Sequence, residues 1–185
     1  CKIFQEKSVK TIIEEVFGEY GMTDYELKLS ATYKEHVYRV QYRETDLDFV
    51  CRLMEEEGMF FYFTHEDGKH SMVIADSKSA YYDLPESKVE GHETEVPSGA
   101  ITDFSHRFEF LSGKWTQQDY NFEKPKTDLE TPEKTILKTP DLSKYEFYDY
   151  PGRYLEKGDG KALSKLRMEE EEANYDVAGG NGTCR

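Results

Sequence analysis

The sequence predicts an α+β fold, rich in β-strands, in which two helices cover one face of a sheet. Two segments place apolar residues at helical spacing, and several others alternate apolar and polar residues as strands do. The 14 Tyr and 11 Phe residues favour strands and interfaces over helix bundles. The first half of the chain reads as helix, strand, strand, helix and hairpin, which is the order of an α+β lobe.

The first helix is expected over residues 8–18, with Ser8 as its N-cap. Residues 25–29 and 36–42 alternate apolar and polar side chains, so each predicts a strand. A polar connection separates these two strands. The apolar residues of the helix recur at intervals of three and four: Val9, Ile12, Ile13, Val16 and Phe17.

A second helix is expected to begin at Thr45, which is a good N-cap residue. Asp48 follows three residues later and can return a hydrogen bond to the cap, as the acid of a capping box does. Gly58 supplies the left-handed residue that ends the helix. The predicted apolar face contains Leu47, Phe49, Val50, Leu53 and Met54.

A β-hairpin is predicted directly after this helix. Residues 59–63 are apolar and aromatic, as in a buried strand, Asp67-Gly68 is a turn signal, and residues 72–75 form the return strand. The composition then changes to Ser, Lys, Glu, Gly and Pro over residues 77–99. We therefore place a surface connection there, and with it the boundary between a first domain of residues 1–97 and a second of residues 98–185.

The second domain is predicted to open with a hairpin. Strands are expected at residues 101–110 and 115–122, joined by a turn at residues 112–114. Residues 123–144 carry three prolines and are expected to be extended and irregular. Residues 145–150 predict a short aromatic strand.

A last helix and a flexible tail are expected at the C-terminal end. Asp159 can cap this helix, and Ala162, Leu163 and Leu166 form a narrow apolar stripe. The run Gly179-Gly180-Asn181-Gly182 has the composition of a flexible tail.

The net charge of −14 limits the classes of partner. It arises from 24 basic and 38 acidic residues, and nucleic acids and anionic membranes both require a basic surface. No nucleic-acid partner is therefore expected. Three cysteines do not make a disulfide framework, because an odd number cannot all pair. Cys51 is expected to be a small buried side chain. No apolar run approaches the ~20 residues of a membrane span, and no signal peptide is visible.

No motif in the sequence carries catalytic chemistry. Histidines at helical zinc-site spacing, a Cys-x-x-Cys pair, a Gly-x-Ser-x-Gly elbow and a phosphate-binding glycine loop are all missing from the sequence. Paired carboxylates are uninformative in so acidic a chain. We therefore identify no catalytic, cofactor-binding or metal-binding residue, and we expect no enzyme. The histidines that were considered are His36, His65, His70, His92 and His106.

Two runs of glutamate lie where the helix dipole disfavours negative charge. Residues 55–57 and 169–172 lie near helix C-termini, where an exposed negative charge costs roughly 0.3–1 kcal/mol. One interpretation is a solvated acidic face that Arg52 or Arg167 partly offsets. The other is that basic residues of a neighbouring subunit bind these acids.

Several motifs carry a family resemblance. They are Gln-Tyr-Arg-Glu-Thr-Asp at 41–46, Phe-Val-x-Arg-Leu-x-Glu-Glu-Glu-Gly at 49–58, the aromatic strand that follows, and Tyr-Pro-Gly-Arg-Tyr at 150–154. Together they resemble the VgrG family, the spike of the bacterial type VI secretion system. The motif residues with an expected structural role are Gln41, Tyr42, Arg43, Glu44, Asp46, Phe49, Arg52, Leu53, Glu57, Gly58, Tyr62, Tyr150, Pro151, Gly152 and Tyr154.

The resemblance implies a phage-tail-hub-like fold with β-barrel-like pieces. Residues 1–97 are then the α+β hub lobe and residues 98–185 part of a hub barrel, truncated at both ends. VgrG proteins are implied to be homotrimers that cap the Hcp tube ring, contact the baseplate and, in some members, carry effectors. They are assembled in the bacterial cytoplasm, secreted, and reach a target membrane only as the assembled spike. A phage tail hub of the late-control D type and a cell-wall hydrolase domain remain as alternatives.

Overall fold

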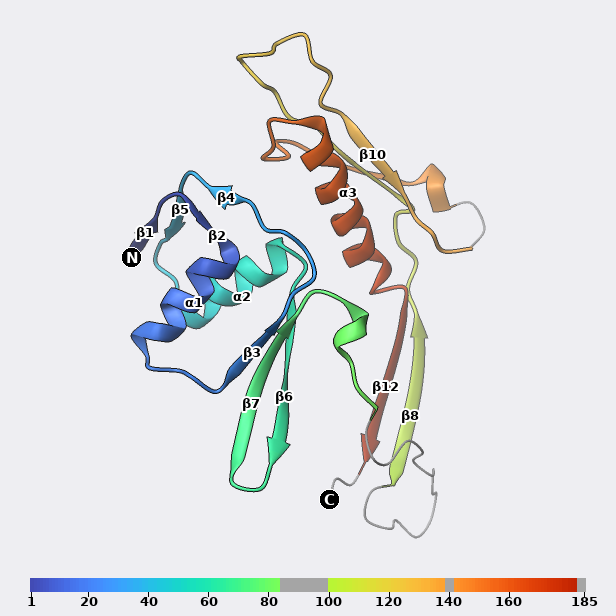
Figure 1. Cartoon of the computed structure of the whole chain (residues 1–185). Coiled ribbons are helices and arrows are strands. Elements are labelled where there is room, and N and C mark those ends of the chain that lie inside the picture. Colours follow the sequence, from blue (N-terminus) through green and yellow to red (C-terminus); the bar gives the residue numbers. More distant parts are fainter. Residues whose placement is uncertain (84–99, 139–141, 183–185) are drawn as a thin grey trace. The chain divides into compact units, whose positions relative to one another are not determined.

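The chain folds into two compact units, residues 1–84 and 85–185, each described here by itself. The structure is a computed structural model that describes residues 1–83, 100–138 and 142–182 (Figure 1). The domain boundary predicted at residue 97 lies outside the described residues. None of the helices in these ranges has the length and hydropathy of a membrane span.

The first unit has the predicted order of helices and strands, with short strands added. Its three-stranded sheet has the order β3–β7–β6, with β3 parallel and β6 antiparallel to β7. The predicted strand at 36–42 is broken into β4 and β5, which pair with β2 and β1 instead. The elements are β1 (Lys2–Phe4), β2 (Lys7–Ser8), α1 (Val9–Glu19), β3 (Tyr25–Lys28), β4 (Glu35–His36), β5 (Arg39–Gln41), α2 (Asp46–Glu56), β6 (Phe60–Glu66), β7 (Lys69–Ala75) and η1 (Lys78–Ala80).

The hydrophobic core of this unit lies between the two helices and the sheet. The prediction that Leu47 belongs to the apolar core face of the helix is wrong, because 67% of its surface is exposed. At about 100° per residue, it sits roughly 90° from the centre of the buried face, whereas Asp46 lies near that centre. Cys51 is free and only partly buried. The core contains Phe4, Val9, Ile12, Ile13, Val16, Phe17, Phe49, Val50, Leu53, Met54, Met59, Met72 and Ile74.

Local sequence signals set both ends of α2. The Asp48 N–H donates to Thr45 Oγ1 at 3.1 Å, which confirms the N-cap. Asp48 does not complete the predicted capping box in the expected way, because its carboxylate accepts from the Thr45 hydroxyl at 2.6 Å. At the other end Gly58 has φ +70°, and the Met59 N–H donates to the Met54 carbonyl at 2.8 Å. This is the Schellman pattern that a left-handed glycine permits.

The predicted hairpin is present as β6 and β7, joined by a turn with Gly68 at φ +72°. The expectation that residues 59–63 are a buried strand is wrong for one side of β6. Phe61 and Phe63 are both exposed. They are open to solvent because β6 is the edge strand of the sheet.

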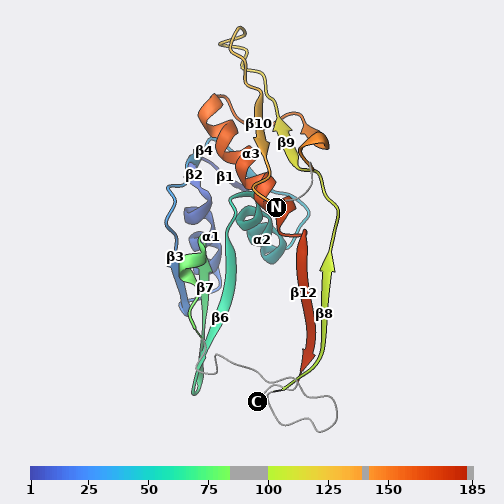
Figure 2. The same ribbon diagram turned by 90° about the vertical axis from the view of Figure 1, so that its right-hand side faces the viewer.

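The second unit contains a three-stranded sheet, a helix and a separate two-stranded ribbon. The sheet has the order β10–β9–β11, and the ribbon pairs β8 with β12 (Figures 1 and 2). The strands in the described ranges form small open sheets, and none of these closes into a barrel. The elements are β8 (Ile101–Phe108), β9 (Lys114–Gln117), β10 (Thr131–Lys134), η2 (Leu142–Lys144), β11 (Glu146–Asp149), α3 (Lys157–Glu172) and β12 (Asp176–Gly182).

Three expectations for this unit are wrong. The hairpin predicted over residues 101–122 does not form, because β8 pairs with β12 while β9 pairs with β10 and β11. The predicted tail at 179–182 is part of β12, whose glycines lie opposite β8 residues such as Phe104 and Ser105. The segment 123–144 is not irregular throughout, since it includes β10.

The buried face of α3 also differs from the predicted stripe. Gly160, Ser164 and Met168 are buried, whereas Ala162 is exposed and the two leucines are only partly covered. The helix begins at Lys157, so Asp159 lies inside the first turn and Glu156 occupies the cap position without a side-chain hydrogen bond. Two of the three buried residues are small, because Gly160 lies against the Tyr154 ring and Ser164 lies against Thr131 of β10.

Candidate functional site

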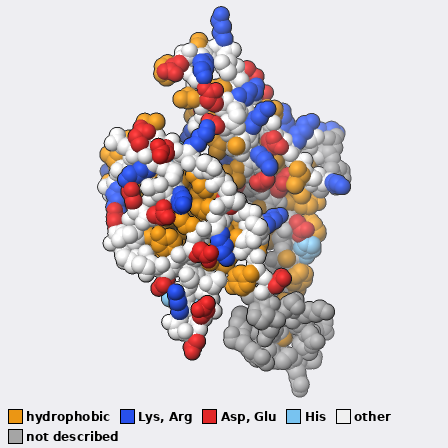
Figure 3. All heavy atoms as spheres, viewed as in Figure 1, with side chains coloured by type: hydrophobic (Ala, Val, Ile, Leu, Met, Phe, Trp, Pro, Cys, Tyr) orange, Lys and Arg blue, Asp and Glu red, His pale blue; other side chains and the backbone are white. Residues whose placement is uncertain are grey.

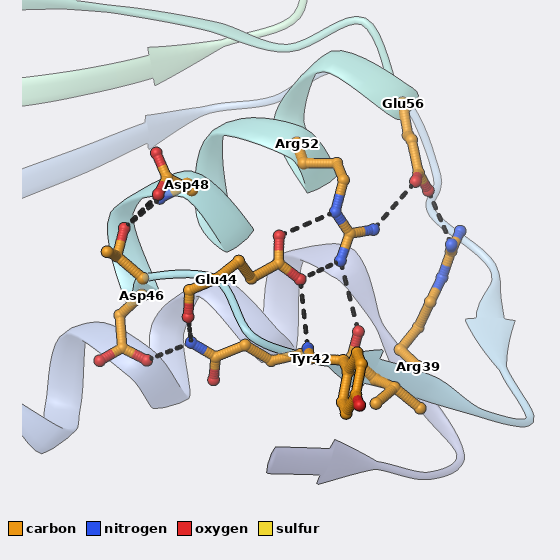
Figure 4. Close-up of polar contacts among 10 residues, drawn as sticks. Arg39, Tyr42, Glu44, Asp46, Asp48, Arg52 and Glu56 are labelled. Carbon is orange, nitrogen blue, oxygen red and sulfur yellow. Dashed lines mark hydrogen bonds and ion pairs between the residues drawn. The ribbon is translucent and has the colours of Figure 1, made fainter. Parts of the chain in front are cut away.

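The motif residues at 41–58 come together where β5 turns into α2 (Figure 4). Gln41, at the end of β5, is buried, and its side-chain amide donates to Asp46 Oδ1 at 2.9 Å. The same Nε2 donates to the Glu44 backbone oxygen at 3.2 Å. One buried amide therefore ties the end of the strand, the turn and the first residue of the helix together.

Glu44 and Arg52 form the second tie across this turn. The Arg52 guanidinium donates to both carboxylate oxygens of Glu44, at 2.6 and 3.1 Å, and to the Val40 carbonyl at 3.3 Å. Its hydrogen bond holds the pKa of Glu44 below the usual range. Bidentate pairing of this kind fixes the relative orientation of the two side chains as well as neutralising their charges.

The first glutamate run is partly neutralised within the chain. Glu56 pairs with Arg52 at 3.2 Å and with Arg39 at 2.7 Å (Figure 4). Glu57 accepts from His36 at 3.2 Å. For Glu56 the interpretation as an acidic face offset by nearby basic residues is supported.

Asp46 connects α2 to the other N-terminal elements. Its carboxylate accepts from the Tyr20 hydroxyl after α1, from Gln41 in β5 and from Lys2 in β1. Hydrogen bonds from Tyr20, then Gln41 and Lys2, lower the pKa of Asp46 to about 2. The carboxylate thus joins four separate segments while it is ionised.

The apolar motif residues lie beneath these polar ties. Phe49 is fully buried and stacks on Phe4 with ring centroids 5.5 Å apart, and the Arg52 guanidinium lies 5.3 Å from the Phe49 ring. Leu53 is also fully buried. On β6, the Tyr62 hydroxyl donates to the Ala80 carbonyl at 2.6 Å and so anchors the segment that follows β7.

Tyr42 and Arg43 are exposed, and they lie between motif residues whose side chains hold the turn. Tyr42 is 62% exposed, and Arg43 takes a left-handed backbone conformation with φ +53°. The Arg43 guanidinium lies 5.1 Å from the centre of the Tyr42 ring.

The second motif, residues 150–154, places α3 on its sheet. The Tyr150–Pro151 peptide bond is cis, and the Gly152 N–H donates to the Gln118 carbonyl at 2.9 Å. A Cβ at Gly152 would lie 2.2 Å from the Tyr154 ring, so only glycine fits. Tyr154 is buried and donates to the Leu129 carbonyl at 2.7 Å.

Sequence reasoning missed the residues that surround Tyr154. A Cβ at Gly160 would lie 2.4 Å from its ring, so α3 also requires glycine there. The Thr131 hydroxyl lies 2.9 Å from both Tyr154 Oη and Ser164 Oγ, and Ser164 donates to the Thr131 carbonyl at 2.8 Å. The spacing of four between Gly160 and Ser164 was the available signal for a helix face made of small residues.

The described side chains of the two motifs hold backbone segments together. No group of three or more metal-binding side chains occurs in the described ranges. His65 and His70 lie opposite each other on the β6–β7 hairpin, and His106 pairs with Asp176 across the ribbon. His92 and Cys184 lie outside the described residues. An open hollow of about 540 Å³ beside Phe110 and Tyr145 includes none of the motif residues.

Comparisons with known proteins agree with the motifs. The chain is 35% identical to the type VI secretion system spike protein VgrG1b of Pseudomonas aeruginosa over 195 aligned residues, which cover 100% of this chain and 25% of that protein. It is 33% identical to the spike protein VgrG3 of Vibrio cholerae over 175 residues, covering 91% of this chain and 17% of that one. The chain therefore spans a quarter or less of the length of these relatives.

The fold is shared with a solved tail protein from Neisseria meningitidis. The TM-score is 0.53 at 13% identity, and the match covers 96% of this chain and 51% of that one. The family model for the phage tail baseplate hub (GPD) matches residues 1–185, the whole of the sequence. The chain belongs to the phage tail baseplate hub (GPD) family.

Proposed function

We propose that this chain is the hub portion of a type VI secretion spike and that its work is mechanical. Its relatives in Pseudomonas aeruginosa and Vibrio cholerae carry the name of spike proteins, and they match it over 91–100% of its length. The motif residues support this proposal because they fix turns, caps and helix positions, as a load-transmitting scaffold requires.

The observation that carries the proposal is the exposed ribbon of β8 and β12. Every residue of β8 is exposed, with Phe104 at 66% and Phe108 at 60%. An isolated two-stranded ribbon is marginally stable in water and needs further strands or a packed face. Phe104, His106 and Phe108 share one face, and Phe104 and His106 lie opposite the small residues Gly180 and Ala178 of β12, so this face is suited to burial in an assembly.

The assembly that fits best is a homotrimer capping the Hcp tube ring. Three copies, each with a net charge of −14, carry −42 together, so long-range repulsion opposes their association. Burial of aromatic surface must outweigh that repulsion, and Figure 3 shows hydrophobic side chains open to solvent between the charged ones. Baseplate proteins and effectors are further partners, nucleic acid is not, and the target membrane is reached only through the assembled spike.

We also propose that this region has no catalysis of its own, and that the spike is assembled in the bacterial cytoplasm and then secreted. The family name favours one alternative, the hub of a phage or phage-like tail, which shares the same fold. Neighbouring genes and the sequence that follows residue 185 would distinguish a type VI secretion hub from a phage-tail hub. A cell-wall hydrolase is the alternative from another class, and a clean hydrolysis band in a zymogram would favour it.

The experiment that tests the proposal measures Hcp release. A strain that lacks the parent protein is complemented with wild type, with the double variant Phe104→Ser/Phe108→Ser, or with Phe122→Ser as a matched control outside the ribbon. Immunoblots of the medium should show Hcp for wild type and the control, and loss of Hcp for the ribbon variant. Hcp release that continues without the parent protein would contradict a hub role.

A further inference from the structure

The turn between β5 and α2 contains an arginine in a backbone conformation that side chains rarely adopt. Arg43 has φ +53°, and the described ranges contain only two other such non-glycine residues, Glu6 and Arg153. Left-handed backbone is unfavourable for an L-residue with a long side chain, and it persists only where the surroundings impose it. The position would suit glycine better, so the arginine side chain must serve a purpose that the fold itself does not explain.

The residues on either side of Arg43 impose this conformation. The Tyr42 N–H donates to Glu44 Oε1 at 3.4 Å, and Arg52 holds the same carboxylate at 2.6 Å (Figure 4). Gln41 holds the Glu44 backbone oxygen. The turn is therefore fixed by groups at 41, 44 and 52, and the two residues between them are left exposed to solvent.

Arg43 also lacks the ion pair that the other arginines of this unit have. Arg39 pairs with Glu56, and Arg52 pairs with Glu44 and Glu56. Within the described ranges Arg43 has no carboxylate partner, although the chain carries 38 acidic and only 24 basic residues. Its one recorded contact is the Tyr42 ring at 5.1 Å, which orients the guanidinium without neutralising it.

We propose that Tyr42 and Arg43 form a recognition point that binds a carboxylate on a second copy of this chain. The inference rests on the proposed hub function and names one contact of that assembly. A planar guanidinium held against an aromatic ring is suited to bidentate binding of a carboxylate. Long-range repulsion opposes every acidic partner of a chain with a net charge of −14, a second copy included, but a second copy also offers exposed aromatic surface whose burial can outweigh that repulsion. A second copy offers many carboxylates, and few unpaired cations are available to meet them.

The first test uses Arg43→Gly in the parent protein. Glycine tolerates φ +53°, so the variant should melt at the wild-type temperature or above it. Its assembly, followed by light scattering across a dilution series in 0.1 M salt, should require at least about tenfold more protein. Lys10→Gln removes an exposed cation of α1 that has no ion-pair partner among the described residues, and it should leave assembly unchanged. Equal assembly of wild type and Arg43→Gly overturns the inference but leaves the hub proposal intact, whereas a monomeric wild type overturns both.

The second test identifies the carboxylate directly. Arg43→Lys is treated with a carbodiimide, which joins a lysine amine to a carboxylate in contact with it, in an assembly prepared from equal amounts of ¹⁴N and ¹⁵N protein. Mass spectrometry should find linked peptides that join Lys at position 43 in one isotope to an acidic peptide in the other. Links only within one isotope, or only to a different baseplate protein, would overturn the assignment to a second copy.

Discussion

Phe49→Ala tests the core of the first unit. Phe49 is fully buried, stacks on Phe4 with ring centroids 5.5 Å apart, and lies under the Arg52 guanidinium. The substitution removes the ring from between the helices and the sheet and leaves a cavity. It also removes the surface against which Arg52 is positioned, so the tie to Glu44 should loosen as well.

The expected cost is large against the whole stability of a domain. Truncation of a buried phenylalanine to alanine costs roughly 3–5 kcal/mol, and a typical domain is stable by about 5–15 kcal/mol. For a unit of this size, each kcal/mol lowers the melting temperature by about 4–8 °C, so the melting temperature should fall by roughly 12–40 °C. Little soluble protein should remain at the lower end of that stability range.

The assay is thermal unfolding followed by circular dichroism, with Phe63→Ala as the matched control. Phe63 is the same residue type in the same unit, but it is 45% exposed on the edge strand β6. Its truncation should shift the melting temperature by only a few degrees. The assignment of the core would be refuted if the two variants melted together, close to wild type.

Three further predictions address the second motif, a carboxylate and the histidines. Gly152→Ala drives a Cβ into the Tyr154 ring and should destabilise the protein by roughly 1–3 kcal/mol, whereas Gly158→Ala, which has open space around it, should be neutral; denaturant midpoints distinguish the two. Burial raises the pKa of Asp76, but hydrogen bonds from residues 30–33 outweigh it and lower the pKa to about 2. Because this value lies below the unfolded value of about 3.9, the stabilisation is complete above pH ~4 and is lost as the pH falls towards 2. Melting curves of Asp76→Asn should therefore depend less on pH over that range. Alanine at any of the exposed histidines His65, His70 and His106 should leave Hcp release within a few-fold of wild type. A turnover activity that is lost in any of these variants would reject a purely structural role.

The helices of the first unit could be predicted because their signals are local. Thr45 and Gly58 lie at the two ends of α2, and the apolar residues between them repeat at helical spacing. The position of Leu47 could not be settled in this way. The polar ties of Asp46 to Tyr20, Gln41 and Lys2 place the aspartate, and not the leucine, on the inward side of the first turn.

The second unit was harder to predict because its pairing is not local. His106 in β8 lies opposite Ala178 in β12, and no nearby turn signal connects strands so far apart in the sequence. The glycines of β12 resemble a linker in composition, and only their pairing with β8 makes them a strand. The face of α3 was missed for a related reason, since Gly160 is buried against the Tyr154 ring and Ser164 against Thr131 of β10, and neither is hydrophobic.

The family motifs located the candidate site but did not show how it works. They contained Tyr154 and Gly152, yet not Thr131 or Ser164, which complete the hydrogen bonds around the ring. They also gave no sign that Tyr42 and Arg43 are exposed while their neighbours in the motif hold the turn. Only the backbone conformation of Arg43 and the positions of its neighbours distinguish these two roles.

The mass of the parent protein in solution tests the hub proposal most directly. Multi-angle light scattering at micromolar concentration should give the mass of three copies in 0.1 M salt. The Debye length falls from ~10 Å at 0.1 M to ~3 Å at 1 M salt, which screens the repulsion between acidic copies, while apolar burial is not screened. The trimer should therefore persist or strengthen at 1 M salt. A monomer under both conditions would contradict the proposal.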